Sequence, residues 1–146
     1  MEGSCVNIKF APHSIVQILA GKKLVTRRTH NLAIVNILPD SWKLNGYGYD
    51  DRGVCIANFT HNITSRWEVC KSKYHQGQQF EVGGKTIEVT GIEVWKVQSI
   101  TNTDVTLEGA ANKEEFIKTW DSIYLVFQHG WERNPWCWRY RFKVVR

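Results

Sequence analysis

The segment GKKLVTRR, residues 21–28, places two lysines, one threonine and two arginines within eight positions and contains no acidic residue. Hydrolysis of an amide requires a nucleophile, a proton shuttle and a group that stabilises the oxyanion. A threonine hydroxyl needs a neighbouring base to become an effective nucleophile, and one of the two lysines could be that base for Thr26. Other cations nearby and partial desolvation would lower the pKa of that lysine. The same segment could instead be a patch that grips phosphate.

The spacing of Lys23 and Thr26 sets a condition on the backbone. In a straight strand two residues three positions apart point to opposite faces. Both side chains can enter one pocket only if residues 22–26 turn, bulge or continue a helix, where such residues are neighbours. We therefore predict that these residues depart from a regular strand. A straight strand with the two side chains on opposite faces would exclude the catalytic interpretation.

Two helices are predicted, one near each end of the chain. Residues 12–21 begin with Pro12, which suits a first helical turn, and end at Gly21. Residues 112–127 form a longer helix whose apolar residues recur at helical spacing, and Asn112 begins it with a capping-box-like pattern. We expect its apolar stripe to pack in the core rather than to bind a ligand: Phe116, Ile117, Trp120, Ile123, Tyr124 and Phe127.

Alternating and apolar segments predict several strands. Gly83 and Gly84 mark a turn, and Gly91 shifts the alternation as a β-bulge would. Residues 40–53 are rich in Gly, Asp and Tyr, which predicts turns and a mobile loop. Strands are expected at residues 6–10, 31–38, 54–59 and 65–70, on both sides of the Gly83–Gly84 turn, and at the C-terminal end.

The C-terminal strand, WCWRYRFKVV, has a strict alternation. Its aromatic residues face one way, and Arg139, Arg141 and Lys143 face the other. This pattern predicts a buried aromatic face and a solvated cationic face. The cationic face could also follow the phosphates of a nucleic acid.

Strands dominate this pattern, so we predict an α+β fold that is mainly β. We expect a small, strongly bent β-barrel with a short N-terminal helix and one longer helix before the last strand. The length of 146 residues suits one domain spanning residues 1–146. No internal repeat, linker or low-complexity segment divides it.

Composition favours an anionic partner and an intracellular setting. The formal charge is +5 and the isoelectric point is about 9.1, with seven Trp, five Tyr and six Phe available for packing or stacking. The four cysteines lie far apart, so we expect free thiols and no metal site. The first ten residues carry no secretory signal and no stretch suits a membrane span. We predict a cytoplasmic protein, in which the sequons at Asn58 and Asn62 are chance matches.

Several stretches together resemble the ASCH domain family of the PUA-like superfamily, especially its short bacterial and phage-encoded forms. ILAGKKLVTRR resembles that family's I-x-x-G-x-K-x-x-T-x-R segment, and KYHQGQQFEV resembles its Y-x-x-G-D-x-x-x-V strand start. IEVWKVQSITNTDVTLEGA resembles the strand and turn that end in Glu-Gly. FIKTWDSIY and WERNPWCWRYRFKVV resemble the helix with W-D-S-I and the closing strand with N-P-W-x-W. Gln78 stands where the family usually has Asp, and residues 40–66, a divergent loop and strand insertion, match none of its motifs.

The resemblance implies a compact barrel with a cleft that is usually linked to RNA. Some small members of the family hydrolyse the amide of acetylated cytidine, and others are associated with RNA cleavage. In the amidohydrolases a Lys, a Thr and a Glu act together, and their motif positions fall here on Lys23, Thr26 and Glu108. Arg28 is a further candidate donor to an oxyanion or a phosphate.

Four functions follow as hypotheses. The first is a basic cleft that binds RNA or a modified nucleoside, and the second is a small amidohydrolase acting on an acylated nucleoside such as N4-acetylcytidine. The third is a ribonuclease acting on single-stranded RNA, and the fourth is an interaction protein that has lost the chemistry. None requires a cofactor, and the oligomeric state is open. The candidate nucleic-acid-binding residues are Lys22, Arg27, Arg28, Arg139 and Arg141.

Overall fold

The computed structural model describes residues 8–145, which form two curved antiparallel sheets and several helices. One sheet has the strand order β1-β7-β6-β5 and the other has the order β2-β3-β4. Among these residues the fold is α+β and mainly β, as predicted, but the two sheets stay separate and form no closed barrel. The strands are β1 (Val25–Arg28), β2 (Trp42–Tyr49), β3 (Val54–His61), β4 (Trp67–His75), β5 (Gln79–Val82), β6 (Lys85–Lys96) and β7 (Trp136–Val144).

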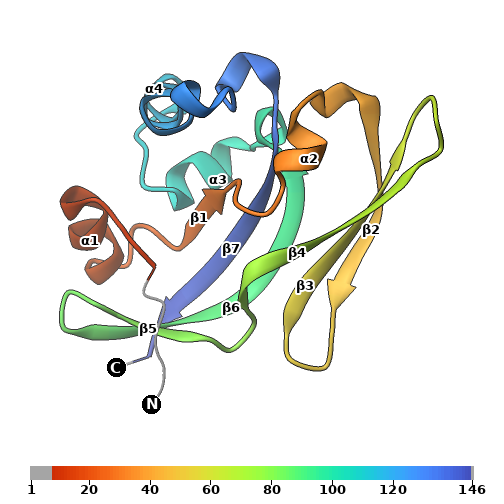
Figure 1. The fold of residues 1–146 in the computed structure, drawn as a ribbon. Coiled ribbons are helices and arrows are strands. Elements are labelled where there is room, and N and C mark those ends of the chain that lie inside the picture. The colour runs from red at the N-terminus through yellow and green to blue at the C-terminus, as the bar shows by residue number, and fades with distance from the viewer. Residues whose placement is uncertain (1–7, 146) are drawn as a thin grey trace.

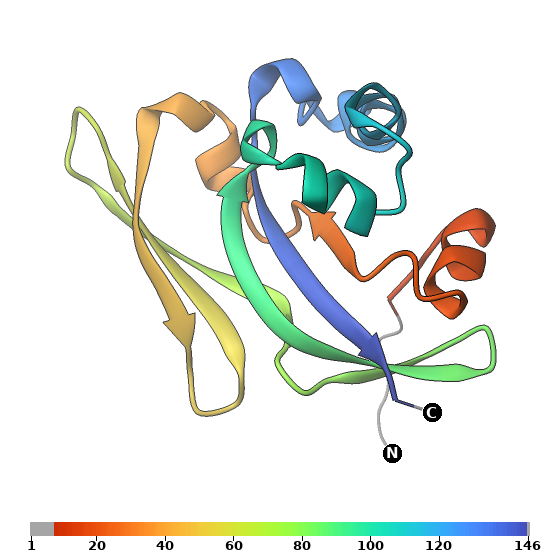
Figure 2. The same ribbon diagram turned by 180° about the vertical axis from the view of Figure 1, so that it is seen from behind.

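Most of the helices lie on one side of the four-stranded sheet, and the three-stranded sheet lies on the other together with the short helix at residues 33–36 (Figures 1 and 2). The larger hydrophobic core therefore lies mainly between the sheets, and a smaller one lies under α3 and α4. The helices are α1 (Pro12–Leu19), α2 (Ala33–Asn36), α3 (Asn102–Leu107) and α4 (Lys113–Tyr124), with 3-10 turns at Pro39–Ser41, Val97–Ser99, Leu125–Phe127 and Trp131–Arg133.

The predicted features of the long hairpin strand are confirmed. Gly83 and Gly84 connect β5 to β6 with φ of 56° and 83°, in the left-handed region that favours glycine. The pairing of β6 with β7 shifts register between Val89 and Gly91. Because the bulge changes the alternation, the apolar residues before it and after it all face the core: Ile87, Val89, Ile92 and Val94.

The C-terminal strand is buried on both faces over its first half, which the alternation did not predict. Trp138 and Tyr140 have no exposed surface on one side, and Cys137 is equally buried on the other, beneath the helices. The predicted solvated cationic face is wrong at Arg139, which is 9% exposed. Arg141 and Lys143 are exposed as expected.

Three segments differ from the predicted secondary structure. Residues 31–38 contain the short helix α2 instead of a strand, because Leu32 and Val35 are buried at helical spacing. Residues 8–10 have no regular structure, and the rest of the predicted strand at residues 6–10 lies outside the described residues. The supposed mobile loop at residues 40–53 is mostly β2, which pairs with β3 along its length.

Strand β2 replaces the predicted loop because tertiary contacts override its glycine-rich composition. Trp42 is 8% exposed and packs in the larger core. The hydroxyl of Tyr49 accepts a hydrogen bond from the Ile92 amide at 2.9 Å, which ties the end of β2 to β6. Only residues 50–53 form a turn. The composition of residues 40–53 therefore predicted the turn that follows β2 but not the strand itself.

The two predicted helices are confirmed as α1 and α4. Pro12 occupies the first turn of α1, and the Asn112 side chain caps α4 by accepting a hydrogen bond from the Glu115 amide at 2.9 Å. Helix α4 ends at Tyr124, three residues before the predicted boundary. Ile123 and Phe127 are 52% and 64% exposed, so the expected core stripe does not extend to them.

The half-buried side chain of His30 makes the stability of the folded protein depend on pH. The Nε2 atom of His30 lies 2.9 Å from the hydroxyl of Tyr140, and its ring contacts the ring of Tyr74. Desolvation, with the charges of Lys73 and Arg28, lowers the pKa of His30 to about 4. The folded protein therefore keeps this ring neutral at pH values where the unfolded chain binds a proton.

This pKa shift predicts a loss of stability on acidification. Because the pKa of His30 is lower in the folded state, its contribution is present above about pH 6.5 and is lost as the pH falls toward 4. We expect the loss to reach about 2 kcal/mol, after allowance for solvent screening of a half-buried ring. Urea unfolding at pH 7 and pH 4.5 measures it, and His30→Gln should show a smaller pH dependence. His75→Gln, a control in β4, should behave like the wild type; equal pH dependence in all three proteins would contradict this role of His30.

Candidate active site

A cavity of about 380 Å³ lies between α1, the start of β1, the end of α3 and one face of α4. It contains all three residues that the resemblance to ASCH domains assigned to catalysis, although Glu108 is 85 residues from Lys23 along the chain. Its polar lining includes Gln17, Lys23, Thr26, Arg27, Arg28 and Glu108, and its aromatic lining includes Phe10, Phe116, Trp120 and Tyr124.

The backbone that carries Lys23 and Thr26 departs from a straight strand, as predicted. Helix α1 stops at Leu19, and Gly21 follows with φ of 74°. The amides of Lys22 and Lys23 then both donate to the carbonyl of Gln17, at 2.8 and 3.2 Å. Strand β1 begins only at Val25, so the segment before it can turn Lys23 toward the cavity that Thr26 also lines.

Glu108 enters the site from the end of a helix that the sequence suggested only as a turn. Thr101 caps the N-terminus of α3 by accepting a hydrogen bond from the Asp104 amide at 3.1 Å. Glu108 is the C-cap residue, and Gly109 follows with φ of 90°. The positive φ favours glycine at this position, and the Gln17 side chain of α1 packs against it, with Nε2 donating to the Gly109 carbonyl at 2.7 Å.

The ammonium group of Lys23 is held by Glu108. Its Nζ donates to the Glu108 carbonyl at 2.7 Å and lies 3.5 Å from the carboxylate Oε1, and the two side chains are only 8% and 7% exposed. Desolvation lowers the pKa of Lys23, Glu108 opposes this effect, and Arg28 and Arg27 add to it. Lys23 therefore has a larger neutral fraction than a surface lysine at the same pH.

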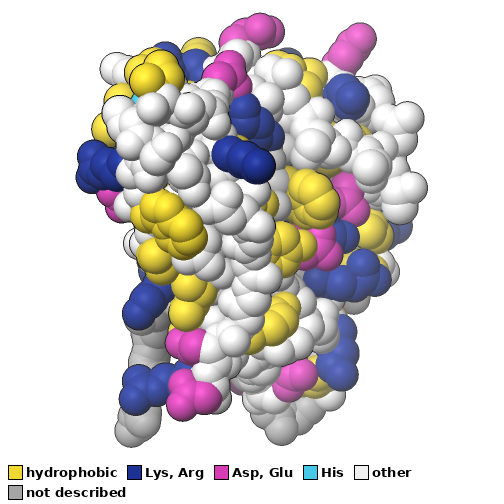
Figure 3. Space-filling model, turned by 90° about the vertical axis from the view of Figure 1, so that its right-hand side faces the viewer, with side chains coloured by type: hydrophobic (Ala, Val, Ile, Leu, Met, Phe, Trp, Pro, Cys, Tyr) yellow, Lys and Arg dark blue, Asp and Glu magenta, His cyan; other side chains and the backbone are white. Residues whose placement is uncertain are grey.

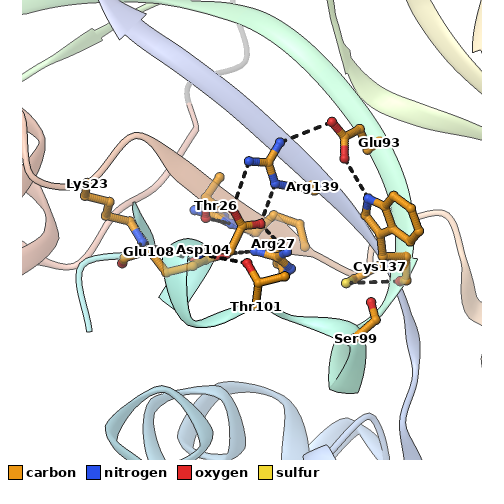
Figure 4. Close-up of polar contacts among 12 residues, drawn as sticks. Lys23, Thr26, Arg27, Glu93, Ser99, Thr101, Asp104, Glu108, Cys137 and Arg139 are labelled. Carbon is orange, nitrogen blue, oxygen red and sulfur yellow. Dashed lines mark hydrogen bonds and ion pairs between the residues drawn. The ribbon is translucent and has the colours of Figure 1, made fainter. Parts of the chain in front are cut away.

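A buried ionic network connects this lysine to the sheet (Figure 4). Arg27 donates to Glu108 Oε2 at 2.9 Å and to Asp104 Oδ2 at 2.6 Å. Arg139 lies beside Arg27 on the neighbouring strand and donates to both oxygens of Asp104 at 2.6 and 3.0 Å. Its third contact is with Glu93 at 3.3 Å. Asp104 thus bridges two adjacent arginines, and with Glu108 it fixes the Arg27 guanidinium.

This network bears on the residues that were expected to bind nucleic acid. Arg27 and Arg139 are 5% and 9% exposed and are engaged by carboxylates, so their guanidinium groups are not free to track phosphates. Their position indicates that they build the site instead. Lys22 and Arg141 are exposed, and neither lines the cavity. Burial could not be read from the alternating pattern, which gives charged residues a solvated face by default.

Arg28 remains at the cavity and contacts Thr26. Its Nε donates to Thr26 Oγ1 at 3.2 Å, and its terminal nitrogen donates to the Lys9 carbonyl at 2.7 Å. The guanidinium also lies over the Phe10 ring, 5.3 Å from its centroid. Because Thr26 and Arg28 are two positions apart in β1, their side chains share one face of the strand. A cationic donor therefore stands beside the candidate nucleophile.

Aromatic residues of α4 form the apolar part of the lining. Phe116 and Trp120 are buried, and the Trp120 and Tyr124 rings lie 4.2 Å apart between centroids. The Trp120 Nε1 atom donates to the His129 carbonyl at 2.8 Å, which fixes the indole. The sequence placed these rings in the core alone. Their spacing of four residues put them on one face, but only the packing of α4 shows that this face also borders a cavity.

Other chemical groups of the described chain lie apart from this cavity. Within residues 8–145, no three His, Cys, Asp or Glu side chains gather where they could hold a metal ion. Cys55, Cys70 and Cys137 are buried free thiols, and burial raises their pKa to about 11, 11 and 12. Cys5 lies outside the described residues.

In the described part of the chain, no helix has both the length and the apolar composition needed to cross a membrane.

Comparison with known proteins gives a likeness of fold. No protein-family model matches this sequence, and no curated protein matches it significantly. Among solved structures it is similar to protein EF3133 of Enterococcus faecalis V583, described with the family model DUF984, with a TM-score of 0.52 and 13% sequence identity. The likeness covers 91% of this chain and 67% of that chain. At this identity the two proteins share a small, mainly β fold, and nothing follows about activity.

Proposed function

We propose that the cavity binds a nucleoside-sized ligand that carries an acylated amine, and that the protein hydrolyses the amide bond. One observation carries this proposal: Lys23, Thr26 and Glu108 come from distant parts of the chain and line the same cavity, with Lys23 buried against Glu108. Buried titratable groups with a specific partner in a cleft are typical of functional sites.

The proposed reaction uses each group at a stated step. The neutral Lys23 amine takes the proton of the Thr26 hydroxyl as Thr26 Oγ1 attacks the carbonyl carbon of the substrate. Arg28, which already donates toward Thr26, stabilises the negative charge that forms on the substrate oxygen. The C–N bond then breaks, and the protonated Lys23 returns its proton to the leaving amine. Water hydrolyses the resulting threonine ester and releases the carboxylic acid.

The remaining residues hold Lys23 and shape the cavity. The carbonyl and carboxylate of Glu108 orient the Lys23 side chain, and Arg27 holds that carboxylate in place. Phe10, Trp120 and Tyr124 offer apolar surfaces to a planar base. The motifs that resemble ASCH domains support an acylated nucleoside such as N4-acetylcytidine as the substrate, and the curved sheet is compatible with a PUA-like fold.

A cavity that binds RNA or a modified nucleoside without turnover is the second candidate. It is favoured by the two oxygens of Glu108 near Lys23 Nζ, because these acceptors stabilise the charged ammonium rather than the amine that a base requires. The burial of Arg27 and Arg139 favours a single nucleoside over a long RNA in this cavity. A ribonuclease would use the same groups on single-stranded RNA.

Incubation of the purified protein with N4-acetylcytidine tests these candidates. We expect release of cytidine and acetate, measured by liquid chromatography and mass spectrometry, and a loss of about 10³-fold in Thr26→Val. Thr106→Val, an exposed threonine of α3 outside the cavity, is the matched control and should retain activity. Absence of turnover in folded wild-type protein would contradict hydrolysis of this substrate. Binding of the nucleoside without turnover, or cleavage of an RNA oligonucleotide, would instead support the second candidate or a ribonuclease.

A further inference from the structure

We propose that the outer face of the β2–β3–β4 sheet binds single-stranded nucleic acid. The outer face consists of the residues that point away from the core in three rows across the sheet. Pairing places Lys43, Thr60 and Trp67 in one row, Gly46, Asn58 and Val69 in the next, and Gly48, Ile56 and Lys71 in the third.

This face carries exposed apolar side chains that no described segment of the chain covers. Trp67 is 67% exposed and Val69 is 53% exposed, and both lie on the edge strand β4. The opposite face of the same strands is buried at Ala57, Phe59 and Cys70. Exposed aromatic and aliphatic side chains that adjoin on one face are typical of interaction sites.

The charges on the outer face have a single sign. Lys43 and Lys71 lie at opposite corners, Lys73 is exposed further along β4, and none of the nine positions is acidic. The nearby carboxylate of Glu68 belongs to the other face and is paired with Arg66 at 2.5 Å. Figure 3, which views this side of the molecule, shows hydrophobic and cationic side chains close to one another, with acidic side chains around them.

The surface is also open where a chain would lie along it. A β-carbon placed at Gly46 or Gly48 would meet no atom within 4 Å, so no neighbour crowds that part of β2. Asn58 and Thr60 provide polar groups between the glycines and Trp67, and Thr60 Oγ1 accepts a hydrogen bond from Asn45 at 2.5 Å. A surface with an exposed indole at one edge and polar groups beside it suits unpaired bases.

Charge complementarity selects the occupant. Stacking of bases on Trp67 uses the apolar surface, and Lys43 and Lys71 neutralise the phosphates of the same strand. A second copy of this chain would bring the same lysines against these, and like charges oppose such pairing. The outer face is distinct from the cavity between α1 and α4 and shares none of its lining residues, so this proposal stands or falls independently of hydrolysis.

Fluorescence anisotropy of labelled 12-nucleotide single-stranded RNA and DNA tests the proposal with the full chain. We expect binding at 50 mM KCl that weakens at 200 mM KCl. Trp67→Ala should weaken it about tenfold through lost stacking. The double substitution of Lys43→Glu and Lys71→Glu should weaken it at least as much and reduce its salt dependence.

Two control variants make the same kinds of substitution at exposed positions outside the outer face. Phe127→Ala removes an aromatic ring that is 64% exposed after α4, and Lys118→Glu reverses an exposed charge on α4. Both should leave affinity within about twofold of the wild type. Circular dichroism confirms that all variants are folded. Absence of binding at 50 mM KCl, or equal loss in control and outer-face variants, would overturn the proposal. Self-association or binding to anionic vesicles that Trp67→Ala abolishes, without nucleic-acid binding, would overturn it as well.

Discussion

Replacing Lys23 with methionine is expected to abolish amide hydrolysis while the protein remains folded. Methionine has a similar length but no amine, so the proposed base for Thr26 is lost. General acid–base catalysis contributes about 10² to 10⁴-fold, and we expect a loss of about 10³-fold in kcat/KM. The protein should remain folded at pH 7, because methionine fills the space of the buried lysine and Arg27 still pairs with the Glu108 carboxylate at 2.9 Å.

The pH dependence of the wild type provides a second readout. A base acts in its neutral form, so kcat/KM should rise with pH and reach a plateau above the pKa of Lys23, which lies below that of a free lysine. Stability should also rise with pH between the folded and the unfolded pKa of this group, because the unfolded chain binds the proton more tightly. Lys113→Met, an exposed lysine in α4, is the matched control and should preserve the rate and its pH profile. Full activity in Lys23→Met would remove Lys23 from the mechanism.

Replacing Asp104 with alanine is expected to cause a large loss of stability. The substitution leaves Arg27 and Arg139 adjacent and buried, and it removes the carboxylate that bridges them. Hydrogen bonds from these two arginines outweigh desolvation and lower the pKa of Asp104, so it is charged at neutral pH. Removal of one partner from a buried ion pair costs about 3–5 kcal/mol. We therefore expect a decrease of that size in the free energy of unfolding.

Urea unfolding at pH 7 measures this effect. Asp40→Ala is the matched control, because the Asp40 carboxylate contacts Lys96 but its side chain is 85% exposed. Exposed ion pairs contribute less than about 1 kcal/mol, so the control should change stability little. Asp104→Asn retains one acceptor without the charge, so its loss in free energy of unfolding should lie between those of Asp104→Ala and Asp40→Ala. Equal destabilisation in Asp104→Ala and Asp40→Ala would show that the network contributes no more than a surface pair.

Local sequence signals were sufficient to predict the elements whose ends or turns require particular residue types. Pro12 began α1 and Asn112 capped α4 because backbone groups at helix ends need such residues. Gly83, Gly84 and Gly91 marked a turn and a bulge because these positions require unusual backbone geometry. The convergence of Lys23, Thr26 and Glu108 was expected from motif resemblance, and the turn before β1 was expected from their spacing once both residues were placed in one pocket.

Elements defined by their partners could not be predicted in this way. Residues 31–38 alternate too little to separate a strand from a helix, and the surrounding core selects α2. Strand β2 forms because its apolar residues pack in the larger core and its backbone pairs with β3. β-propensity depends on such neighbours, so the glycines of residues 46 and 48 predicted a loop.

The sequence by itself determined the residue types at the cavity and the backbone irregularity before β1 that lets Lys23 and Thr26 line it together. Tertiary structure alone decided how the charges are used. Arg27 and Arg139 look alike in sequence to Arg28 and Arg141, but Asp104 binds both of the first pair and Glu108 binds Arg27, whereas Arg28 donates to Thr26 at the cavity. A charge is stable inside a protein only with a partner of opposite sign, and the partners of Arg27 come from a helix that lies 77 and 81 residues away along the chain.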